Sequence, residues 1–268
     1  MSHTPPAGHP NDAMREFPPD PFPSPDAHLA ALGLTRKFGS FVAVEDVALS
    51  LPAGRCLSIF GPNGAGKTTL LKMLALLMRP SDGRIWVNGE DATQGASRDA
   101  LRGRIGLLSH QSLLYGHLSP VENLNFYGKL YGVPRLRDRI EEVLAALGLS
   151  GWARDPVRRF SRGMLQRTAI ARVLLHDPDI LFLDEPFTGL DRSGARVLME
   201  LLVLLREGGR TLILTTHDLE RGLELGHEVM ILHRGRSQYT SPRSEIDPGT
   251  FAEVYEHHTE GRRPEVRK

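Results

Sequence analysis

The stretch GPNGAGKT, residues 61–68, decides the fold of this chain. It fits the pattern G-x-x-x-x-G-K-[S/T], in which a glycine-rich loop wraps around phosphate groups. The apolar run RCLSIF (55–60) before it predicts a buried strand, and KTTLLKMLALLM (67–78) after it predicts a helix. A strand, a glycine-rich loop and a helix in this order distinguish a phosphate-binding loop from an ordinary glycine-rich turn.

The residue types in this loop suit a nucleoside triphosphate. Glycines let the backbone approach phosphate oxygens closely, and the N-terminal end of the helix adds a positive potential. Lys67 is expected to neutralise the β- and γ-phosphates, the Thr68 hydroxyl to bind Mg²⁺, and Thr69 to donate to the α-phosphate. The loop residues expected to bind the nucleotide are Gly61, Pro62, Asn63, Gly64, Ala65, Gly66, Lys67, Thr68 and Thr69.

Two further predicted strands end in polar residues that can complete such a site. The run DILFLDEP (179–186) brings Asp184 and Glu185 to its C-terminal end, where ligands bind in open parallel sheets. Asp184 is expected to hold Mg²⁺, and Glu185 to polarise the attacking water. His217 ends the next strand and is suited to sense the γ-phosphate. Such carboxylates can also be solvated or cap a helix, and a lone histidine is often structural, so these roles depend on the neighbouring loop.

The composition excludes several classes of protein. The chain has 268 residues and a net charge of +1, so no strong field draws it to nucleic acid or to an anionic membrane. The single cysteine, Cys56, rules out an intrachain disulfide, fits a reducing compartment and is expected to be a core thiol. No apolar run approaches the ~20 residues that span a bilayer, so membrane association would depend on another protein.

The pattern along the chain predicts three segments. Residues 1–27 are proline-rich and are expected to form a disordered extension. Residues 28–240 alternate strand and helix patterns and form the predicted folded domain. Residues 241–268 are expected to be a tail that ends in the polar, basic stretch GRRPEVRK.

Two kinds of sheet are predicted inside the folded domain. Period-two alternation of apolar residues over 42–51 predicts antiparallel strands, and RIWVNG (84–89) predicts another edge strand. Short apolar runs predict a parallel sheet that is covered on both faces. These runs lie at 55–60, 105–109, 179–183, 211–216 and 228–233.

A helical insert is predicted between residues 112 and 165, where the strand patterns stop. Ser119-Pro120-Val121-Glu122 is a capping box with proline at the first helical position. The run DRIEEVLAAL (138–147) predicts a second helix, ended by Gly148. A mainly helical unit therefore interrupts the α/β core.

Six motifs follow one another along the chain: GPNGAGKTT (61–69), SHQ (109–111), FSRGMLQR (160–167), LFLDEP (181–186), TGLD (188–191) and TTHD (215–218). In this order they resemble the motifs of the ATP-binding subunits of ABC transporters. The resemblance covers residues 28–240, and the guanine-reading N-K-x-D of GTPases is absent from the sequence. It implies an α/β fold: a P-loop NTPase (RecA-like) core with an antiparallel β subdomain and a helical subdomain at about 112–165.

The resemblance also implies roles for individual residues. Gln111 matches the glutamine that contacts Mg²⁺ and the water, and Phe38 matches the aromatic that stacks on adenine. Glu185 matches the general base and His217 the switch histidine, while Asp191 matches the aspartate of a loop that crosses to a second subunit.

FSRGMLQR matches the family's signature segment, usually L-S-G-G-Q. Ser161 and Gly163 are kept and are expected to contact the ATP of a partner chain, whereas Arg162 and Met164 depart from the usual residues. The resemblance therefore implies an ATP-hydrolysing homodimer that uses ATP and Mg²⁺, binds integral-membrane permease subunits and binds no nucleic acid. It places the chain at the cytoplasmic face of the cell membrane, held there by the permease.

The signature and the stretch LSHQSLLYGHLSPVENLNFYGKLYGV (108–133) resemble those of the haem exporters of cytochrome c maturation. The phrase ENLNFYGKLYG (122–132) also resembles exporters of drugs and other small ABC ATPases. Haem export is the expectation, and a drug or other small-molecule exporter is the alternative. A soluble ABC ATPase that transports nothing is a third reading. Such ATPases usually carry two cassettes or a long coiled coil, and neither pattern is present in the sequence.

Overall fold

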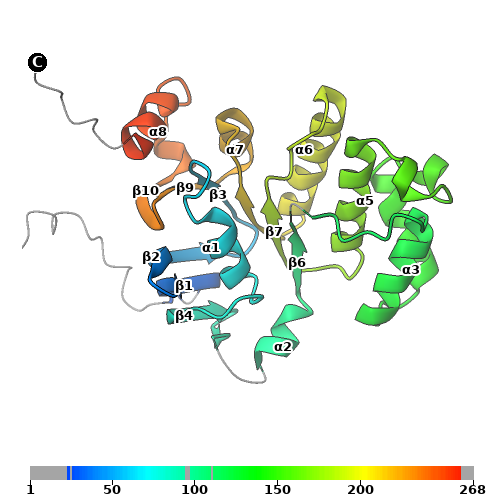
Figure 1. The fold of residues 1–268 in the computed structure, drawn as a ribbon, viewed down its shortest axis with the longest axis horizontal. Coiled ribbons are helices and arrows are strands. Elements are labelled where there is room, and N and C mark those ends of the chain that lie inside the picture. The colour runs from blue at the N-terminus through cyan, green and yellow to red at the C-terminus, as the bar shows by residue number, and fades with distance from the viewer. Residues whose placement is uncertain (1–22, 25, 94–96, 110, 261–268) are drawn as a thin grey trace, which may run out of the picture.

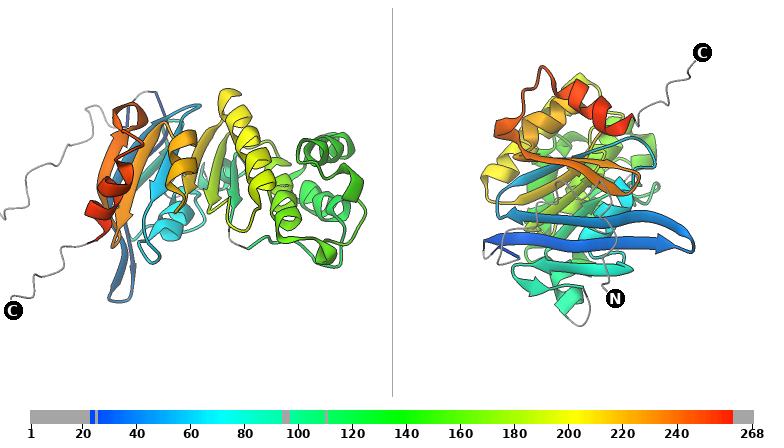
Figure 2. Two further views of the ribbon diagram at one scale, coloured as in Figure 1. Left: turned by 90° about the horizontal axis from the view of Figure 1, so that it is seen from above. Right: turned by 90° about the vertical axis from the view of Figure 1, so that its left-hand side faces the viewer.

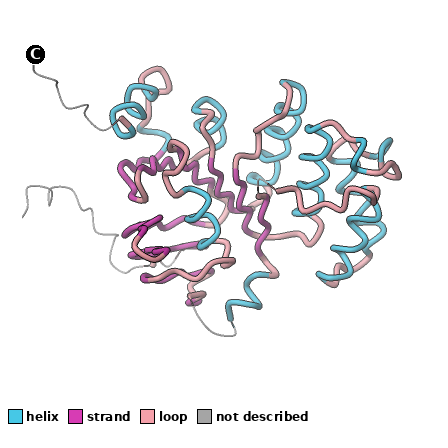
Figure 3. Tube along the Cα trace, viewed as in Figure 1, coloured by secondary structure: helices cyan, strands magenta, loops and turns pink. Residues whose placement is uncertain are grey.

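Two sheets form the framework of the molecule (Figure 1 and Figure 3). The computed structural model describes residues 23–24, 26–93, 97–109 and 111–260. The smaller sheet is antiparallel and has the strand order β2-β1-β4-β5. Its strands are β1 (Ala27–Phe38), β2 (Phe41–Pro52), β4 (Asp82–Val87) and β5 (Glu90–Asp91).

The alternation over residues 42–51 lies in an antiparallel sheet, as predicted, but it forms one strand, β2, whose partner β1 was not predicted as a strand. Two further differences concern β4 and the N-terminus. The expected edge strand, β4, lies between β1 and the two-residue strand β5 and is not at the edge. Residues 1–22 and 25 of the expected N-terminal extension lie outside the described residues, and β1 already begins at Ala27.

The larger sheet has the strand order β10-β9-β3-β8-β7-β6. All neighbours from β9 to β6 are parallel, as predicted, and only β10 runs antiparallel, alongside β9. The strands are β3 (Cys56–Phe60), β6 (Ile105–Leu108), β7 (Ile180–Asp184), β8 (Thr211–Thr215), β9 (Glu228–His233) and β10 (Arg236–Pro242). Burial raises the pKa of the Cys56 thiol to about 12, which agrees with its prediction as a core thiol.

Helices pack on both sides of the larger sheet (Figure 2). Helix α1 (Lys67–Leu74) shares one apolar core with strands of both sheets. Helices α5 (Arg162–Leu174) and α6 (Arg192–Glu207) share a second core with β6, β7 and β8. Helix α7 (Leu219–Leu225) packs with β9 and the end of β3 in a third.

Helix α1 is shorter than the predicted helix 67–78. It ends at Leu74, and Leu76 has a left-handed φ of 59°. The short helix α2 (Ser97–Arg102) explains this ending, because its buried Arg98 donates to the Leu76 carbonyl at 2.7 Å and to the Met78 carbonyl at 3.0 Å. The apolar pattern continues past Leu74, but these bonds satisfy the carbonyls in a turn and not in a further helical turn.

A helical unit lies at one end of the molecule, away from the smaller sheet (Figure 1 and Figure 2). It contains α3 (Pro120–Tyr131), α4 (Leu136–Ala146), the 3₁₀ turns η1 (Ser150–Trp152) and η2 (Val157–Arg159), and the start of α5. The predicted capping box is present at α3: the Glu122 amide donates to the Ser119 hydroxyl, and the Ser119 amide donates to the Glu122 carboxylate. The helix predicted at 138–147 is α4, which starts two residues earlier.

The expected C-terminal tail is wrong for residues 241–259. After β10 the chain forms the 3₁₀ turn η3 (Arg243–Glu245) and helix α8 (Phe251–Thr259). Phe251 is 1% exposed, and its ring packs edge-on against Phe60 with centroids 5.2 Å apart. This part of the chain is therefore folded onto the core, while the stretch GRRPEVRK (261–268) lies outside the described residues. Within the described part of the chain, no helix has the length and apolarity needed to cross a bilayer.

Candidate active site

The phosphate-binding loop is confined on two sides by other parts of the chain. A Cβ added to Gly66, which has φ +102°, would overlap the Ala43 carbonyl of β2. A Cβ added to Gly61, which has φ +153°, would overlap the Leu232 carbonyl of β9. The Gly235 amide, in the turn between β9 and β10, donates to the Ala65 carbonyl at 2.9 Å. Glycine is therefore required at positions 61 and 66 because another backbone segment lies so close, as well as because of the φ angles.

Lys67, at the start of α1, is the buried cation of the site. Its ammonium donates to the carbonyl of Gly61 at 2.6 Å and to that of Pro62 at 3.2 Å, and lies 3.9 Å from the Glu185 carboxylate. Burial lowers the pKa of Lys67, and the charges of Glu185 and Asp184 oppose this shift. A phosphate group that enters the loop would therefore contact a poorly solvated ammonium group, which the loop carbonyls of Gly61 and Pro62 hold in place.

Asp184, the last residue of β7, is buried and is held by two hydroxyl groups. Thr68 Oγ1 donates to Oδ2 at 2.9 Å, and Thr215 Oγ1 donates to Oδ1 at 2.7 Å. A carboxylate next to a threonine hydroxyl is the hard oxygen donor set that Mg²⁺ prefers alongside phosphate oxygens. Thr68 and Asp184 therefore fit a magnesium ion. Thr215 is a supporting residue that sequence reasoning missed, because its role depends on the pairing of β7 with β8.

Glu185 follows β7 in a strained conformation. Its φ is +52°, which a residue other than glycine rarely adopts. Its amide donates to the Thr215 carbonyl at 3.1 Å, and His217 Nδ1 donates to its carboxylate at 2.8 Å. The side chain of His217 is 69% exposed and that of Glu185 25%. The strain thus places a carboxylate, oriented by a histidine, at the mouth of the cleft.

A cleft of about 310 Å³ brings Lys67, Thr68, Asp184 and Glu185 together. It is lined by Phe41, Ala43, Pro62, Asn63, Gly64, Ala65, Gly66, Lys67, Thr68, Thr69, Asp184 and Glu185. The predicted loop residues Pro62 to Thr69 therefore meet both carboxylates here. Gly61 lies directly behind them, and its carbonyl accepts a hydrogen bond from Lys67.

Phe41, and not the expected Phe38, lines this cleft. The two phenylalanines pair across the turn between β1 and β2, and both are exposed. The guanidinium of Arg36 lies 4.7 Å from the centroid of the Phe38 ring. Two aromatics flanking the same two-residue turn, Gly39-Ser40, were the signal available in the sequence. Choosing between them requires the geometry of the hairpin.

Five other predicted site residues do not line this cleft, and of these His217 contacts a lining residue, Glu185. Gln111 is exposed, and its carbonyl accepts a hydrogen bond from Ser109 at 2.9 Å. Ser161 is the N-cap of α5 and accepts from the Met164 amide at 3.3 Å, with Gly163 half-buried beside it. Asp191 is the N-cap of α6 and accepts from the Gly194 amide at 2.8 Å. Ser161 and Asp191 are exposed, so they remain accessible to another molecule.

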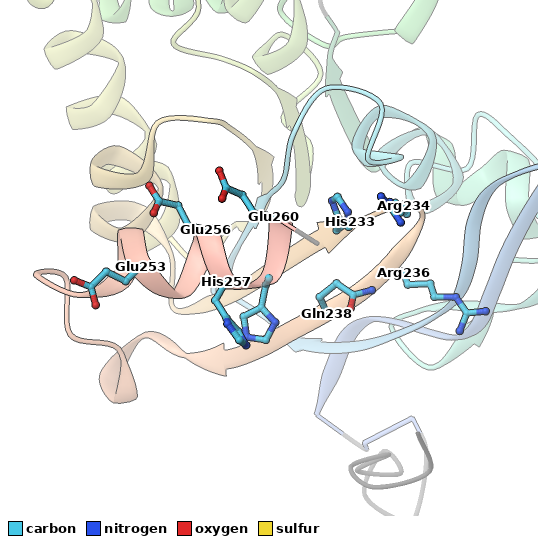
Figure 4. Close-up of a pocket in the computed structure, with 9 residues that line it drawn as sticks. His233, Arg234, Arg236, Gln238, Glu253, Glu256, His257 and Glu260 are labelled. Atoms are coloured by element: carbon cyan, nitrogen blue, oxygen red, sulfur yellow. The ribbon is translucent and has the colours of Figure 1, made fainter. Parts of the chain in front are cut away.

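A second, larger hollow lies between α8 and the hairpin of β9 and β10 (Figure 4). It has a volume of about 900 Å³ and contains side chains of both charges. They are His233, Arg234, Arg236, Gln238, Glu253, Glu256, His257, His258 and Glu260. Its described lining contains no glycine-rich loop, and its three glutamates lie among arginines and histidines with no buried lysine such as Lys67. The smaller cleft is therefore the candidate nucleotide site.

Comparison with known proteins agrees with this geometry. The family model described as ABC transporter matches residues 44–188. The chain is 38% identical over 214 residues to the ABC transporter ATP-binding protein NatA of Bacillus subtilis, covering 76% of this chain and 86% of that protein. It is also 38% identical over 213 residues to the daunorubicin resistance ATP-binding protein DrrA3 of Streptomyces coeruleorubidus, covering 79% of this chain and 67% of that protein. Other relatives are named for Nod factor export and for sulfate/thiosulfate import.

Among solved structures, the chain resembles the ATP-binding cassette MJ0796, described as a dimer in a post-hydrolysis state bound to ADP and Pi. The TM-score is 0.74 at 26% sequence identity, over 81% of this chain and 100% of that one. This likeness agrees with the predicted α/β fold, its antiparallel β subdomain and its helical subdomain. On these grounds the chain belongs to the ABC transporter family, as an ATP-binding and ATP-hydrolysing subunit.

Proposed function

We propose that two copies of this chain close head to tail over two ATP–Mg²⁺ and drive export through a separate integral-membrane permease. One observation carries the proposal: the cleft holds the phosphate loop and both carboxylates, while Ser161 and Asp191 are exposed outside it. A second copy could supply these groups to the open side of the cleft. The dimeric form of the related cassette MJ0796 supports this arrangement.

The side chains of the cleft suit hydrolysis of the γ-phosphate. Lys67 is placed to neutralise charge on the β- and γ-phosphates, and Mg²⁺, when bound at Thr68 and Asp184, would supply further neutralisation. Glu185 is proposed to accept a proton from the attacking water as the new P–O bond forms and the bond to the β-phosphate oxygen breaks. His217, which donates to Glu185 at 2.8 Å, orients that carboxylate. Most of the acceleration would come from positioning and charge stabilisation.

Gln111 is proposed to join the site only when the subunits close. It lies two residues before Leu113, whose carbonyl accepts a hydrogen bond from the Tyr127 hydroxyl of α3. The fully buried Asn123 of α3 holds the same segment, because it accepts from the Tyr115 amide at 2.8 Å and donates to the Ser119 carbonyl at 3.0 Å. Movement of α3 would therefore move the segment that carries Gln111.

An exposed aromatic and aliphatic surface on this helical unit is the proposed permease contact. It comprises Leu113, Tyr115, Phe126, Leu130 and Tyr131, which are between 41% and 68% exposed. The rings of Tyr115 and Phe126 pack edge-on with centroids 5.1 Å apart. Exposed apolar patches of this kind mark protein interaction sites. The permease would hold the subunit at the cytoplasmic face of the membrane, since no described helix can span it.

Export of a small molecule is the proposed direction of transport, and the relative DrrA3, named for daunorubicin resistance, supports it. Haem export for c-type cytochromes is the more specific proposal, and it rests on the motif resemblance alone. Deleting the gene and measuring covalently bound haem in c-type cytochromes separates the two. Loss of bound haem supports haem export. Normal cytochromes together with raised sensitivity to a drug support export of another small molecule.

The hydrolysis mechanism is tested by Glu185→Gln. This variant should bind ATP normally, lower turnover at least ~100-fold and accumulate an ATP-bound dimer in size-exclusion chromatography. Glu207→Gln, at the exposed C-terminal end of α6, is the matched control and should behave as the parent chain. Normal turnover by Glu185→Gln would contradict the assigned base.

Shared sites are tested by mixing chains that carry Lys67→Ala with chains that carry Ser161→Arg. Each variant alone has two defective sites, whereas a mixed dimer has one intact site. We expect the mixture to recover up to about a quarter of parent turnover, since half of the dimers are mixed and each holds one of two sites. Absence of any recovery would contradict the head-to-tail dimer.

A further inference from the structure

Arg162, the unusual third residue of the signature, lies directly against Gly189 of the segment TGLD (188–191). A Cβ added to Gly189 would fall on the arginine's Cδ, Nε and Cζ atoms. Gly189 also has a left-handed φ of +80°. The arginine side chain therefore fills space that only a glycine at position 189 leaves open.

Two more contacts join the same helix to the same loop. Gln166 Nε2 donates to the Pro186 carbonyl at 2.9 Å. The Leu190 side chain lies within ordinary van der Waals distance of the position where Gly163 would carry a Cβ. Since Arg162 and Gln166 are four residues apart, they lie on one face of α5. The first turns of α5 and the loop 186–191 thus pack against each other.

The contact between Arg162 and Gly189 is one of packing and not of charge. Among the described residues, no side-chain hydrogen bond or ion pair is found for the Arg162 guanidinium, although it lies beside the loop. The Glu185 amide is held by the Thr215 carbonyl and its carboxylate by His217, although its carbonyl also accepts from the Thr188 amide of the loop at 3.2 Å. A loosened loop would therefore mainly shift Asp191 relative to Ser161 and leave the phosphate loop in place.

We propose that Arg162 is a positioning residue that holds the loop 186–191 against the signature segment. Ser161 and Asp191 then reach the partner's ATP as one rigid unit. The inference rests on the proposed head-to-tail dimer and adds a residue to it. It also gives a physical reason for arginine at this position. The usual glycine has no side chain, whereas the Arg162 side chain packs against Gly189 and so restrains the loop.

Four variants test the packing. Arg162→Gly and Gly189→Ala should each lower turnover roughly tenfold, the first by removing the contact and the second by displacing the arginine. Alanine at position 189 is strained at φ +80° whatever residue is at 162, so the double variant should fall below Arg162→Gly, but by less than the product of the two single losses, because no arginine is left to displace. Arg162→Met keeps an unbranched side chain without charge and should stay within about twofold of the parent. ATP affinity of the isolated subunit should be unchanged in all four.

A mixed dimer locates the effect. One chain carries Lys67→Ala and supplies the signature of the only intact site, and the other carries Ser161→Arg and supplies its phosphate loop. Adding Arg162→Gly to the first chain should lower turnover about tenfold, and adding it to the second should change nothing.

Three results would overturn the proposal. Equal losses from both placements would indicate a general structural role. Loss in Arg162→Met together with normal turnover in Arg162→Lys would indicate that charge matters and packing does not. An inactive mixed dimer before Arg162 is changed would refute the shared site itself, whereas failure of the positioning role alone leaves that dimer active.

Discussion

Replacing Phe251 with alanine tests whether α8 belongs to the fold. Phe251 is 1% exposed, packs edge-on against Phe60 and lies in an apolar cluster with Val229 and Ile231. Deleting a fully buried phenylalanine costs about 3–5 kcal/mol, because apolar contacts are lost and a cavity remains. About 0.5–1.5 kcal/mol of this belongs to the aromatic pair. We therefore expect the melting temperature to fall by about 6–20 °C.

Thermal unfolding gives the melting temperature and equilibrium unfolding in urea gives the free energy of unfolding, both without nucleotide and both followed by the fluorescence of Trp86 and Trp152. Phe41→Ala is the matched control, because it removes the same atoms from a side chain that is 63% exposed. The control should change the free energy of unfolding by no more than about 0.5 kcal/mol. A loss below about 1 kcal/mol in Phe251→Ala would refute the packing of α8, and would restore the reading of residues 241–259 as a tail.

Three more predictions follow from single contacts. Phe41→Ala should weaken ATP binding by about 1–2 kcal/mol, as expected for a lost base–aromatic stack, while Phe38→Ala should change the affinity less than about twofold; titration with a fluorescent ATP analogue measures both. Burial lowers the pKa of His176 below 6.5, so its neutral form stabilises the fold above that pH and the stability is lost as the pH falls. His176→Gln should flatten the decline in unfolding free energy between about pH 7 and pH 5 in urea titrations. Gly66→Ala should abolish ATP binding because of the Ala43 carbonyl, whereas Gly89→Ala, in the turn between β4 and β5, has open space and should cost only about 1–2 kcal/mol of stability, as calorimetry can show.

Much of the fold could be predicted because its signals are local. The strand, glycine-rich loop and helix at 55–74 lie together in the sequence, and the capping box at Ser119 satisfies its own helix end. The short apolar runs of the parallel sheet were found within one residue of their observed bounds. These features depend on neighbouring residues, so no knowledge of distant contacts was needed.

The missed features depend on contacts between distant segments. Helix α8 has only a few apolar residues, and its sequence looks like a tail until Phe251 meets Phe60. Thr215 supports Asp184 only because β8 pairs with β7. The difference between Phe38 and Phe41 depends on how one hairpin faces the phosphate loop.

Residues outside the six motifs also hold the active site in place. The last motif ends at Asp218, yet the phosphate loop is confined by the Leu232 carbonyl and bonded through its Ala65 carbonyl to the Gly235 amide. Phe60, which immediately precedes the loop, is in turn covered by Phe251 of α8. A loop that must wrap a triphosphate closely needs a fixed backbone. Residues 228–259 fix this backbone by packing against the side of the loop that faces away from the cleft. The six motifs therefore specify the chemistry, and the fold of the C-terminal segment holds the loop in the shape that the chemistry requires.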